Sequence, residues 1–475
     1  MQLLTKNKSH DLGHLQAWRF FTFAPIRKKI TDMRIKLTLL LGLLWLSGAF
    51  AQRSIKFEEY TLPNGLHVIL HEDHSTPIVA VTVLYHVGSK NEDPERTGFA
   101  HFFEHLLFEG SENIDRGEYS KIVVSSGGAL NANTTQDRTF YYEVLPSNQL
   151  ELGLWLESER MLHAKIDIEG VETQREVVKE EKRTRIDNQP YMSFQEHMFK
   201  RAYSVHPYTW VPIGSMDHLN AAKLEEFISF YKRFYIPNNA TLSIAGDFDS
   251  EQAKEWIQLY FGDIPKGAEI VRPNVVEPPL QGEIRDTIYD NIQLPAVFQA
   301  YRMPKETDAD AYALQMVTNL LSKGKSSRFQ KELVDNQQLA LQVMAFPFNL
   351  EDGGLFISLG LVQMGKELSD LEKGMDAEVL RIQNELITDE EYQKLLNQME
   401  NDLVSSYASV AGIAEELANF HVYFGDANLI NTQIEKYRAV KKEDIQRVAK
   451  KYLTPESRVV LIYLPKSMEP QSSNE

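Results

Sequence analysis

Short β-branched runs bounded by turn residues recur along the first half of the chain. Leu66–Leu70 reads LHVIL and Ile78–Tyr85 reads IVAVTVLY, and Gly, Pro, Asn or Ser residues flank both runs. Phe140–Leu145 and Ala240–Ala245 have a similar composition, and a Gly-Asp turn follows the latter. Such runs are typical of strands, so the pattern predicts four strands between residues 66 and 245.

Between these strands lie stretches with the length and composition of helices. Gly98–Glu109 reads GFAHFFEHLLFE, and Gly110 directly after it is the C-cap that we expect. Two more helices are predicted near residues 148–163 and 171–186, and Phe227–Tyr235 has the composition of a helix end. Alternating strands and helices predict an α+β fold.

The same order of elements begins again after a stretch rich in Pro, Gly and charge. Residues 264–282 have this composition, which is typical of an interdomain linker. Pro295–Tyr301 is then strand-like and Tyr312–Leu321 is helix-like. A shift of 214 residues places Leu106–Gly110 on Leu320–Gly324, so that both are the end of a helix followed by glycine. A duplicated domain explains this repeat.

The N-terminus is predicted to be a targeting segment. Leu37–Phe50 is apolar or small throughout, which is too short for a comfortable membrane span and suits a signal-peptide core. A small-x-small cleavage site, Ala49–Ala51, follows it. We expect residues 1–51 to be a signal peptide with an upstream extension, Met33 being an alternative start to Met1. An uncleaved membrane anchor is the alternative; after cleavage no stable membrane span is expected.

Composition and charge exclude several classes of function. The 475 residues predict two to four domains at roughly 100–200 residues each. The formal net charge of −17 disfavours nucleic-acid binding. The absence of cysteine excludes disulfides, thiol nucleophiles and Cys-based zinc sites. Export across the inner membrane into a bacterial periplasm is compatible with a chain that has no cysteine.

One short motif carries the candidate chemistry. In His101–His105 (HFFEH), the residues His101, Glu104 and His105 fall on one face of the predicted helix. Two imidazoles spaced i and i+4 reach one metal ion, and Glu104 then lies beside a metal-bound water. The opposite face carries Phe102, Phe103, Leu106 and Leu107. The alternative is a solvated polar helix face that binds nothing.

A catalytic zinc normally has three protein ligands, so a third must come from elsewhere in the chain. The charged stretch Glu172–Glu181 (ETQREVVKEE) is the best source. Spacing alone does not choose among its four candidates, Glu172, Glu176, Glu180 and Glu181.

With this motif and a glutamate about 75 residues downstream, the chain resembles the pitrilysin/insulinase family of metallopeptidases. It is most similar to the branch that includes the mitochondrial processing peptidases and short bacterial homologues. The resemblance extends over about residues 57–465. Further matching stretches are Val87–Ser89, Gly98–Ala100, Glu109–Ser111, Gly127–Thr134, His206–Tyr208, Ile213–Gly214, Pro237–Ala240 and Gly246–Asp247.

The resemblance implies a fold of two homologous α/β-sandwich domains, which together form half of a clam-shell. Each domain would be a mixed, mostly antiparallel sheet covered by helices. The catalytic zinc-binding domain would span residues 52–263, the linker 264–282 and the homologous non-catalytic domain 283–465. Residues 466–475 are expected to be a disordered tail.

The resemblance also implies a complete site with one zinc ion per chain. Glu181 becomes the third ligand, with Glu180 as its main competitor, and Glu104 becomes the general base for water activated by zinc. The accessory glutamate of relatives is Gln174 here, which puts the strength or the pH profile of the site in doubt. An edge strand containing Asn131, Ala132 and Asn133 would pair with an extended peptide substrate.

The second domain departs from the complete family pattern. The 214-residue shift places Gln315, Thr318 and Asn319 on the motif, so no metal site is expected there. Relatives also supply an Arg and a Tyr that bind substrate, and Val334 and Leu341 stand at these places. We therefore expect a heterodimer with a homologous subunit that lacks zinc ligands but supplies the pair. A homodimer is the alternative.

The function that follows is that of a zinc-dependent endopeptidase acting on extended peptides or unfolded polypeptides. A non-catalytic scaffold or binding subunit of the same fold is the alternative, and a metal-storage or metal-delivery protein is a third hypothesis. Glu104 discriminates among them, because peptide hydrolysis needs this carboxylate and metal binding alone does not.

Overall fold

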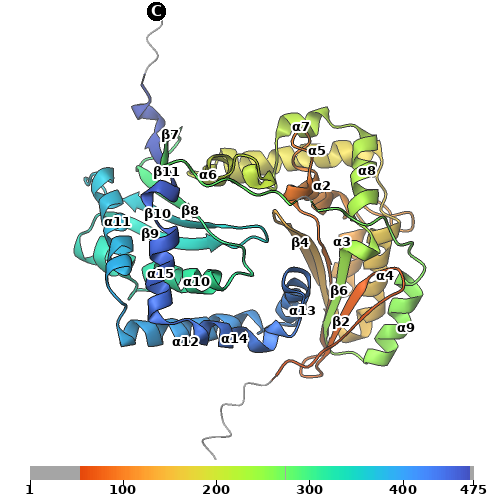
Figure 1. The fold of residues 1–475 in the computed structure, drawn as a ribbon. Coiled ribbons are helices and arrows are strands. Elements are labelled where there is room, and N and C mark those ends of the chain that lie inside the picture. The colour runs from red at the N-terminus through yellow and green to blue at the C-terminus, as the bar shows by residue number, and fades with distance from the viewer. Residues whose placement is uncertain (1–53, 273, 471–475) are drawn as a thin grey trace, which may run out of the picture. The chain divides into compact units, whose positions relative to one another are not determined.

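The computed structural model describes residues 54–272 and 274–470. The predicted signal peptide and the last five residues of the predicted tail lie outside the described residues. The statements below concern the compact unit that begins at Ile55 (Figure 1). Within the described ranges, no helix is long and apolar enough to cross a membrane.

Six strands form the first sheet, in the order β1-β2-β6-β3-β5-β4. Strands β2 and β6 run parallel and the other neighbours run antiparallel. The bounds are β1 Glu58–Thr61, β2 His67–Glu72, β3 Ile78–Tyr85, β4 Ala129–Thr134, β5 Thr139–Pro146 and β6 Ala240–Gly246. All four strands predicted between residues 66 and 245 are therefore present, shifted by no more than two residues at either end.

Five strands form the second sheet, in the order β7-β11-β8-β10-β9. Here β7 and β11 are the parallel pair and the other neighbours are antiparallel. The bounds are β7 Ile284–Asp290, β8 Ala296–Arg302, β9 Ala340–Phe348, β10 Leu355–Val362 and β11 Arg458–Pro465. Two mixed, mostly antiparallel sheets with helices confirm the predicted α+β fold.

Helices cover both sheets. In the first half they are α2 Phe99–Leu106, α3 Tyr119–Ser125, α4 Leu150–Leu162, α5 Ile168–Lys182, α6 Phe194–Ala202, α7 Met216–Ala221, α8 Leu224–Phe234 and α9 Ser250–Phe261. In the second half they are α10 Ala309–Ser322, α11 Leu368–Asn384, α12 Asp389–Ser406, α13 Val410–Asn419, α14 Leu429–Ala439 and α15 Lys442–Tyr452. The described residues between α9 and β7, which include most of the predicted linker, form neither helix nor strand.

Helix α13 comes from the second half of the sequence but packs on the first sheet (Figure 1). Ala414 meets Ala80 of β3 and Ala245 of β6, and all three side chains are fully buried. Three methyl side chains let the helix backbone approach the sheet closely. One turn further along α13, Ala418 packs beside Phe140. The two halves thus share a core that the separate strand and helix patterns do not reveal.

The predicted helix 98–109 is shorter than expected. Helix α2 ends at Leu106, and its C-cap is Leu107, not Gly110. Gly110 has φ = 136°. A Cβ atom at Gly110 would lie 2.5 Å from the carbonyl oxygen of Ile114. The glycine therefore serves the turn that follows the helix, where the backbone approaches itself closely.

Candidate active site

A buried carboxylate and a layer of aromatic rings fix the position of α2. Glu92 accepts hydrogen bonds from the backbone N–H of Gly98 (2.9 Å) and Ala100 (2.8 Å), and from the indole of Trp210 (3.1 Å). These bonds satisfy donors at the start of the helix. Burial raises the pKa of Glu92 to about 8. The aromatic layer consists of Phe99, Phe102 and Phe103 of α2 with Phe227 and Phe230 of α8.

Three predicted metal ligands converge on one point. Glu181, in the last turn of α5, places Oε2 at 3.0 Å from Nε2 of His105 and 3.5 Å from Nε2 of His101. The two imidazole rings are 4.9 Å apart and nearly perpendicular, at 79°. In a tetrahedral zinc site with bonds of about 2.0–2.1 Å, ligand atoms lie about 3.3 Å from one another. The three donors therefore fit a zinc ion.

The structure distinguishes Glu181 from the three carboxylates that compete with it. Glu172 pairs with Arg175 at 3.1 Å, and Glu176 pairs with Lys179 at 2.8 Å. The exposed Glu180 pairs with Arg183. Of these four glutamates only Glu181 contacts a histidine, because α5 turns the other three away from α2.

Local electrostatics favour the metal-binding charge states of His101 and Glu181. Burial lowers the pKa of His101 to about 4, so its ring is neutral at neutral pH. The hydrogen bond from the His105 side chain lowers the pKa of Glu181, which keeps this carboxylate ionised. Burial raises the pKa of Glu104 on the same helix. Neutral imidazoles and an ionised carboxylate are the forms that bind zinc.

Gln174 makes a specific contact that a glutamate would not. Its Nε2 donates a hydrogen bond to the carboxylate of Glu109, which also pairs with Arg116. A glutamate at position 174 would bring a second carboxylate against Glu109, and like charges at this distance disfavour ionisation. The amide therefore avoids a like-charge contact with Glu109 beside the predicted metal ligands. Unlike a glutamate, it cannot gain or lose a proton.

The predicted substrate strand lies at the edge of the first sheet. Strand β4 pairs with β5 on one side and, within the part of the chain that the structure describes, has no strand on its other side. Asn131 is exposed, Ala132 is buried, and Asn133 accepts a hydrogen bond from Arg138 (3.2 Å). An edge strand presents free backbone N–H and C=O groups to an extended peptide. Helix α2 packs beside β4, so such a peptide would run close to Glu104.

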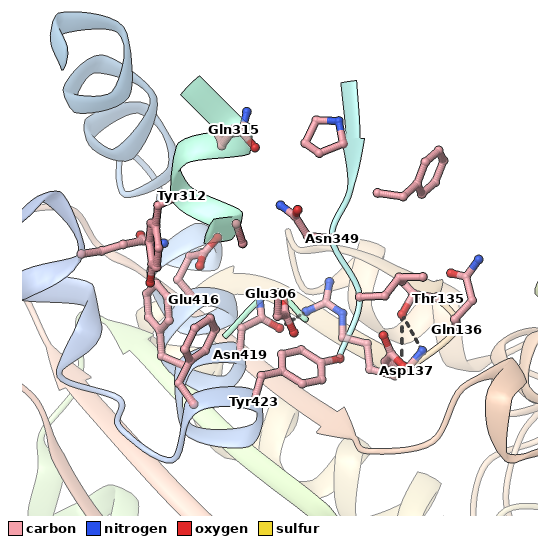
Figure 2. Close-up of a pocket in the computed structure, with 18 of the residues that line it drawn as sticks. Thr135, Gln136, Asp137, Glu306, Tyr312, Gln315, Asn349, Glu416, Asn419 and Tyr423 are labelled. Carbon is pink, nitrogen blue, oxygen red and sulfur yellow. Dashed lines mark hydrogen bonds between the residues drawn. The ribbon is translucent and has the colours of Figure 1, made fainter. Parts of the chain in front are cut away.

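A cavity of about 560 Å³ begins where β4 ends (Figure 2). Thr134–Arg138 forms one wall, and α10, the end of β9 and the end of α13 form the others. Glu306 and Glu416 face it, and neither carboxylate has a hydrogen-bond or ion-pair partner in the described part of the chain. Burial raises the pKa of Glu306 to about 8 and that of Glu416 to about 7. No sequence motif pointed to these two residues.

Comparisons with known proteins place the chain in a family. Residues 67–210 match the family described as Insulinase (Peptidase family M16), and residues 221–399 match its Peptidase M16 inactive domain. The zinc protease PqqE of Helicobacter pylori is 32% identical over 401 residues, which cover 84% of this chain and 90% of that protein. The chain therefore belongs to the insulinase family of peptidases (Peptidase family M16). The predicted membership of the pitrilysin/insulinase peptidases is thereby confirmed.

The chain is also similar to other proteins over most of its length. A probable mitochondrial-processing peptidase subunit beta of Arabidopsis thaliana is 24% identical, over 83% of this chain and 75% of that protein. The crystal structure of a protease from Helicobacter pylori superposes with a TM-score of 0.82, 31% identity, and coverage of 86% of this chain and all of that chain. The periplasmic protease PqqL of Escherichia coli has the same fold (TM-score 0.73, 18% identity), and 86% of this chain covers 47% of it.

Proposed function

We propose that this M16 chain is a zinc-dependent endopeptidase that cleaves extended peptides or unfolded polypeptides. The observation that carries the proposal is the convergence of His101, His105 and Glu181 on one point, with Glu104 on the same helix as the two histidines. The zinc protease PqqE, which is 32% identical, supports the assignment.

The residues of the site have separate roles in this reaction. His101, His105 and Glu181 would hold zinc, which supplies Lewis acidity and an activated water when bound. Glu104 takes the proton of the attacking water and delivers it to the leaving amine. Burial raises the pKa of Glu104. A general base that must also release its proton works best when its pKa lies closer to neutral pH, and the raised pKa moves Glu104 in that direction. Glu92 holds the start of α2 and so keeps Glu104 in place.

The substrate would bind as an additional strand on β4. Backbone pairing with Asn131, Ala132 and Asn133 recognises an extended main chain and reads little of its sequence. The cavity at the end of β4 would then receive side chains further along the peptide.

Removal of zinc is expected to abolish cleavage. Treatment with a chelator should leave the fold in place, because the aromatic layer and the Glu92 contacts hold α2 without the metal. Cleavage of a fluorogenic peptide should fall to the uncatalysed rate and return after one equivalent of Zn²⁺ is added. A chelated, zinc-free protein that still cleaves the peptide would refute the proposal.

A non-catalytic subunit of the same fold is the second candidate. The match to the M16 inactive domain and the departures at Gln174, Val334 and Leu341 favour it. In the structure Val334 packs against the hydrophobic core of the second half, and Leu341 is 55% exposed on the edge strand β9. Neither side chain supplies the charge or the hydroxyl of the Arg/Tyr pair. If the chain binds zinc but cleaves no peptide in any assay, this candidate is favoured.

We also propose that the chain works as a heterodimer with a homologous subunit that lacks zinc ligands and supplies the Arg/Tyr pair. The 47% coverage of PqqL supports this arrangement, because that single chain has room for two units of this size. Mixing the purified chain with such a subunit should raise kcat/KM at least about tenfold, as a substrate contact of about 1.4 kcal/mol would. Full activity of the chain alone as a homodimer would contradict the heterodimer.

The proposal also includes the domain boundaries of the chain and its cellular compartment. Residues 52–263 would form the catalytic domain and residues 283–465 the non-catalytic domain, joined by residues 264–282. The residues that precede position 52 would be removed on export to the periplasm. Mass spectrometry of the protein purified from a periplasmic extract tests both points, since Gln52 should be its first residue.

A further inference from the structure

A second group of metal-ligating side chains lies outside the proposed active site. Glu59 of β1, His67 of β2 and His421 bring one donor atom each to within 4.8 Å of one another. His421 belongs to the short helix η7, Phe420–Phe424, which directly follows α13. Among the described residues, this is the one such group besides His101, His105 and Glu181.

The fold determines how the three residues meet. In the β1–β2 ladder Thr61 is paired with His67 and Glu59 with Ile69, so Glu59 and His67 are diagonal neighbours on one face. Phe420 and Leu417 pack against Ile69 on this face. That apolar contact delivers His421, which lies 352 residues after Ile69 in the sequence, to the pair on the sheet.

The donor distances resemble those of the active-site group. Oε2 of Glu59 is 3.2 Å from Nε2 of His67 and 3.9 Å from Nδ1 of His421. The other nitrogen of His67, Nδ1, is 3.1 Å from the hydroxyl of Thr61. Ligating histidines usually use their second nitrogen in this way, because the hydrogen bond fixes the tautomer and directs the lone pair to the metal.

We propose that Glu59, His67 and His421 form a second binding site for a divalent transition-metal ion of the zinc type. Two imidazoles and a carboxylate select zinc, cobalt, nickel or copper over calcium and magnesium, which require oxygen ligands. The ion would join β1 and β2 of the first sheet to η7 of the second half. Its role is structural, because it links two strands of the first sheet to the short helix that packs against them.

Binding requires one local movement. The rings of His67 and His421 are stacked, with centroids 3.5 Å apart and an angle of 3° between their planes. The nitrogen lone pairs of the two rings therefore lie in parallel planes. The movement would be a rotation of the His421 side chain, which is 32% exposed, about its Cβ–Cγ bond. Rotation would bring the two rings to a crossed arrangement such as that of His101 and His105, which meet at 79°.

Zinc stoichiometry of the full chain tests this site independently of peptidase activity. The double variant His101→Ala/His105→Ala removes the first site, and it should still bind one Zn²⁺ by elemental analysis after equilibration at micromolar free zinc. Adding His421→Asn to the double variant should weaken this binding at least about tenfold. Glu59→Gln should have the same effect, and it should not disturb the fold because the Glu59 side chain is 42% exposed.

His74→Ala is the matched control. His74 also contacts two carboxylates, but through different ring nitrogens: Nε2 with Glu72 at 3.0 Å and Nδ1 with Asp247 at 2.5 Å. Two carboxylates on opposite sides of one ring cannot share an ion with it, so this variant should retain the zinc. The proposal is overturned if the double variant binds no zinc. It is also overturned if the zinc survives both His421→Asn and Glu59→Gln while circular dichroism shows a folded protein.

Discussion

Glu104→Gln is expected to retain zinc and to lose cleavage by at least about 10³-fold in kcat. The amide has nearly the shape of the carboxylate but cannot accept the proton of the attacking water. The three proposed ligands His101, His105 and Glu181 are untouched, so the zinc content should remain that of the wild type. The measurement pairs kcat on a fluorogenic peptide with elemental analysis of the same sample.

Glu176→Gln is the matched control for this substitution. Glu176 lies on α5, close in sequence to Glu181, but it is exposed and pairs with Lys179 at 2.8 Å. Its kcat should stay within about twofold of the wild type, since an exposed pair of this kind contributes little. If Glu104→Gln loses its zinc together with its activity, Glu104 is a ligand and its assignment as the general base is wrong.

Arg160→Met is expected to lower the free energy of unfolding by about 3–5 kcal/mol. The Arg160 side chain is fully buried and pairs with Glu143 at 3.0 Å and Glu157 at 3.2 Å, both also fully buried. It donates a hydrogen bond to the hydroxyl of Tyr119 at 2.7 Å and lies 4.1 Å from the centre of the Tyr141 ring. Without the guanidinium, two buried carboxyl groups would have no cation.

Urea unfolding measures this loss, with Arg183→Met as the control. Arg183 pairs with Glu180 on the surface, where its side chain is 64% exposed, so the control should change the free energy of unfolding by less than about 1 kcal/mol. Equal, small effects of the two substitutions would show that the buried cluster does not stabilise the first half of the chain.

The sequence predicted well those elements that depend only on the pattern of neighbouring residues. The β-branched runs of β2, β3 and β6 need only their own residues to be recognised, and the apolar face of α2 is apparent from Phe102 and Phe103. The helix end was placed wrongly because Gly110 serves the turn that follows the helix, where its backbone closely approaches that of Ile114.

The parts of the site that depend on distant contacts required either the resemblance or the structure. Spacing leaves four glutamates open, and only the family pattern selects Glu181 among them. In the structure Glu181 contacts both histidines. Glu306 and Glu416 meet in one cavity although 110 residues separate them, and neither belongs to a motif. No periodicity in the sequence indicates that α13 packs on the first sheet.

Anomalous diffraction at the zinc edge, on crystals of the zinc-loaded chain, is the most direct test of the central claim. The account predicts a peak within about 2.0–2.2 Å of Nε2 of His101, Nε2 of His105 and a carboxylate oxygen of Glu181, with Glu104 beside it but not bound to it. Full loading with zinc and no peak at these three side chains would contradict the account.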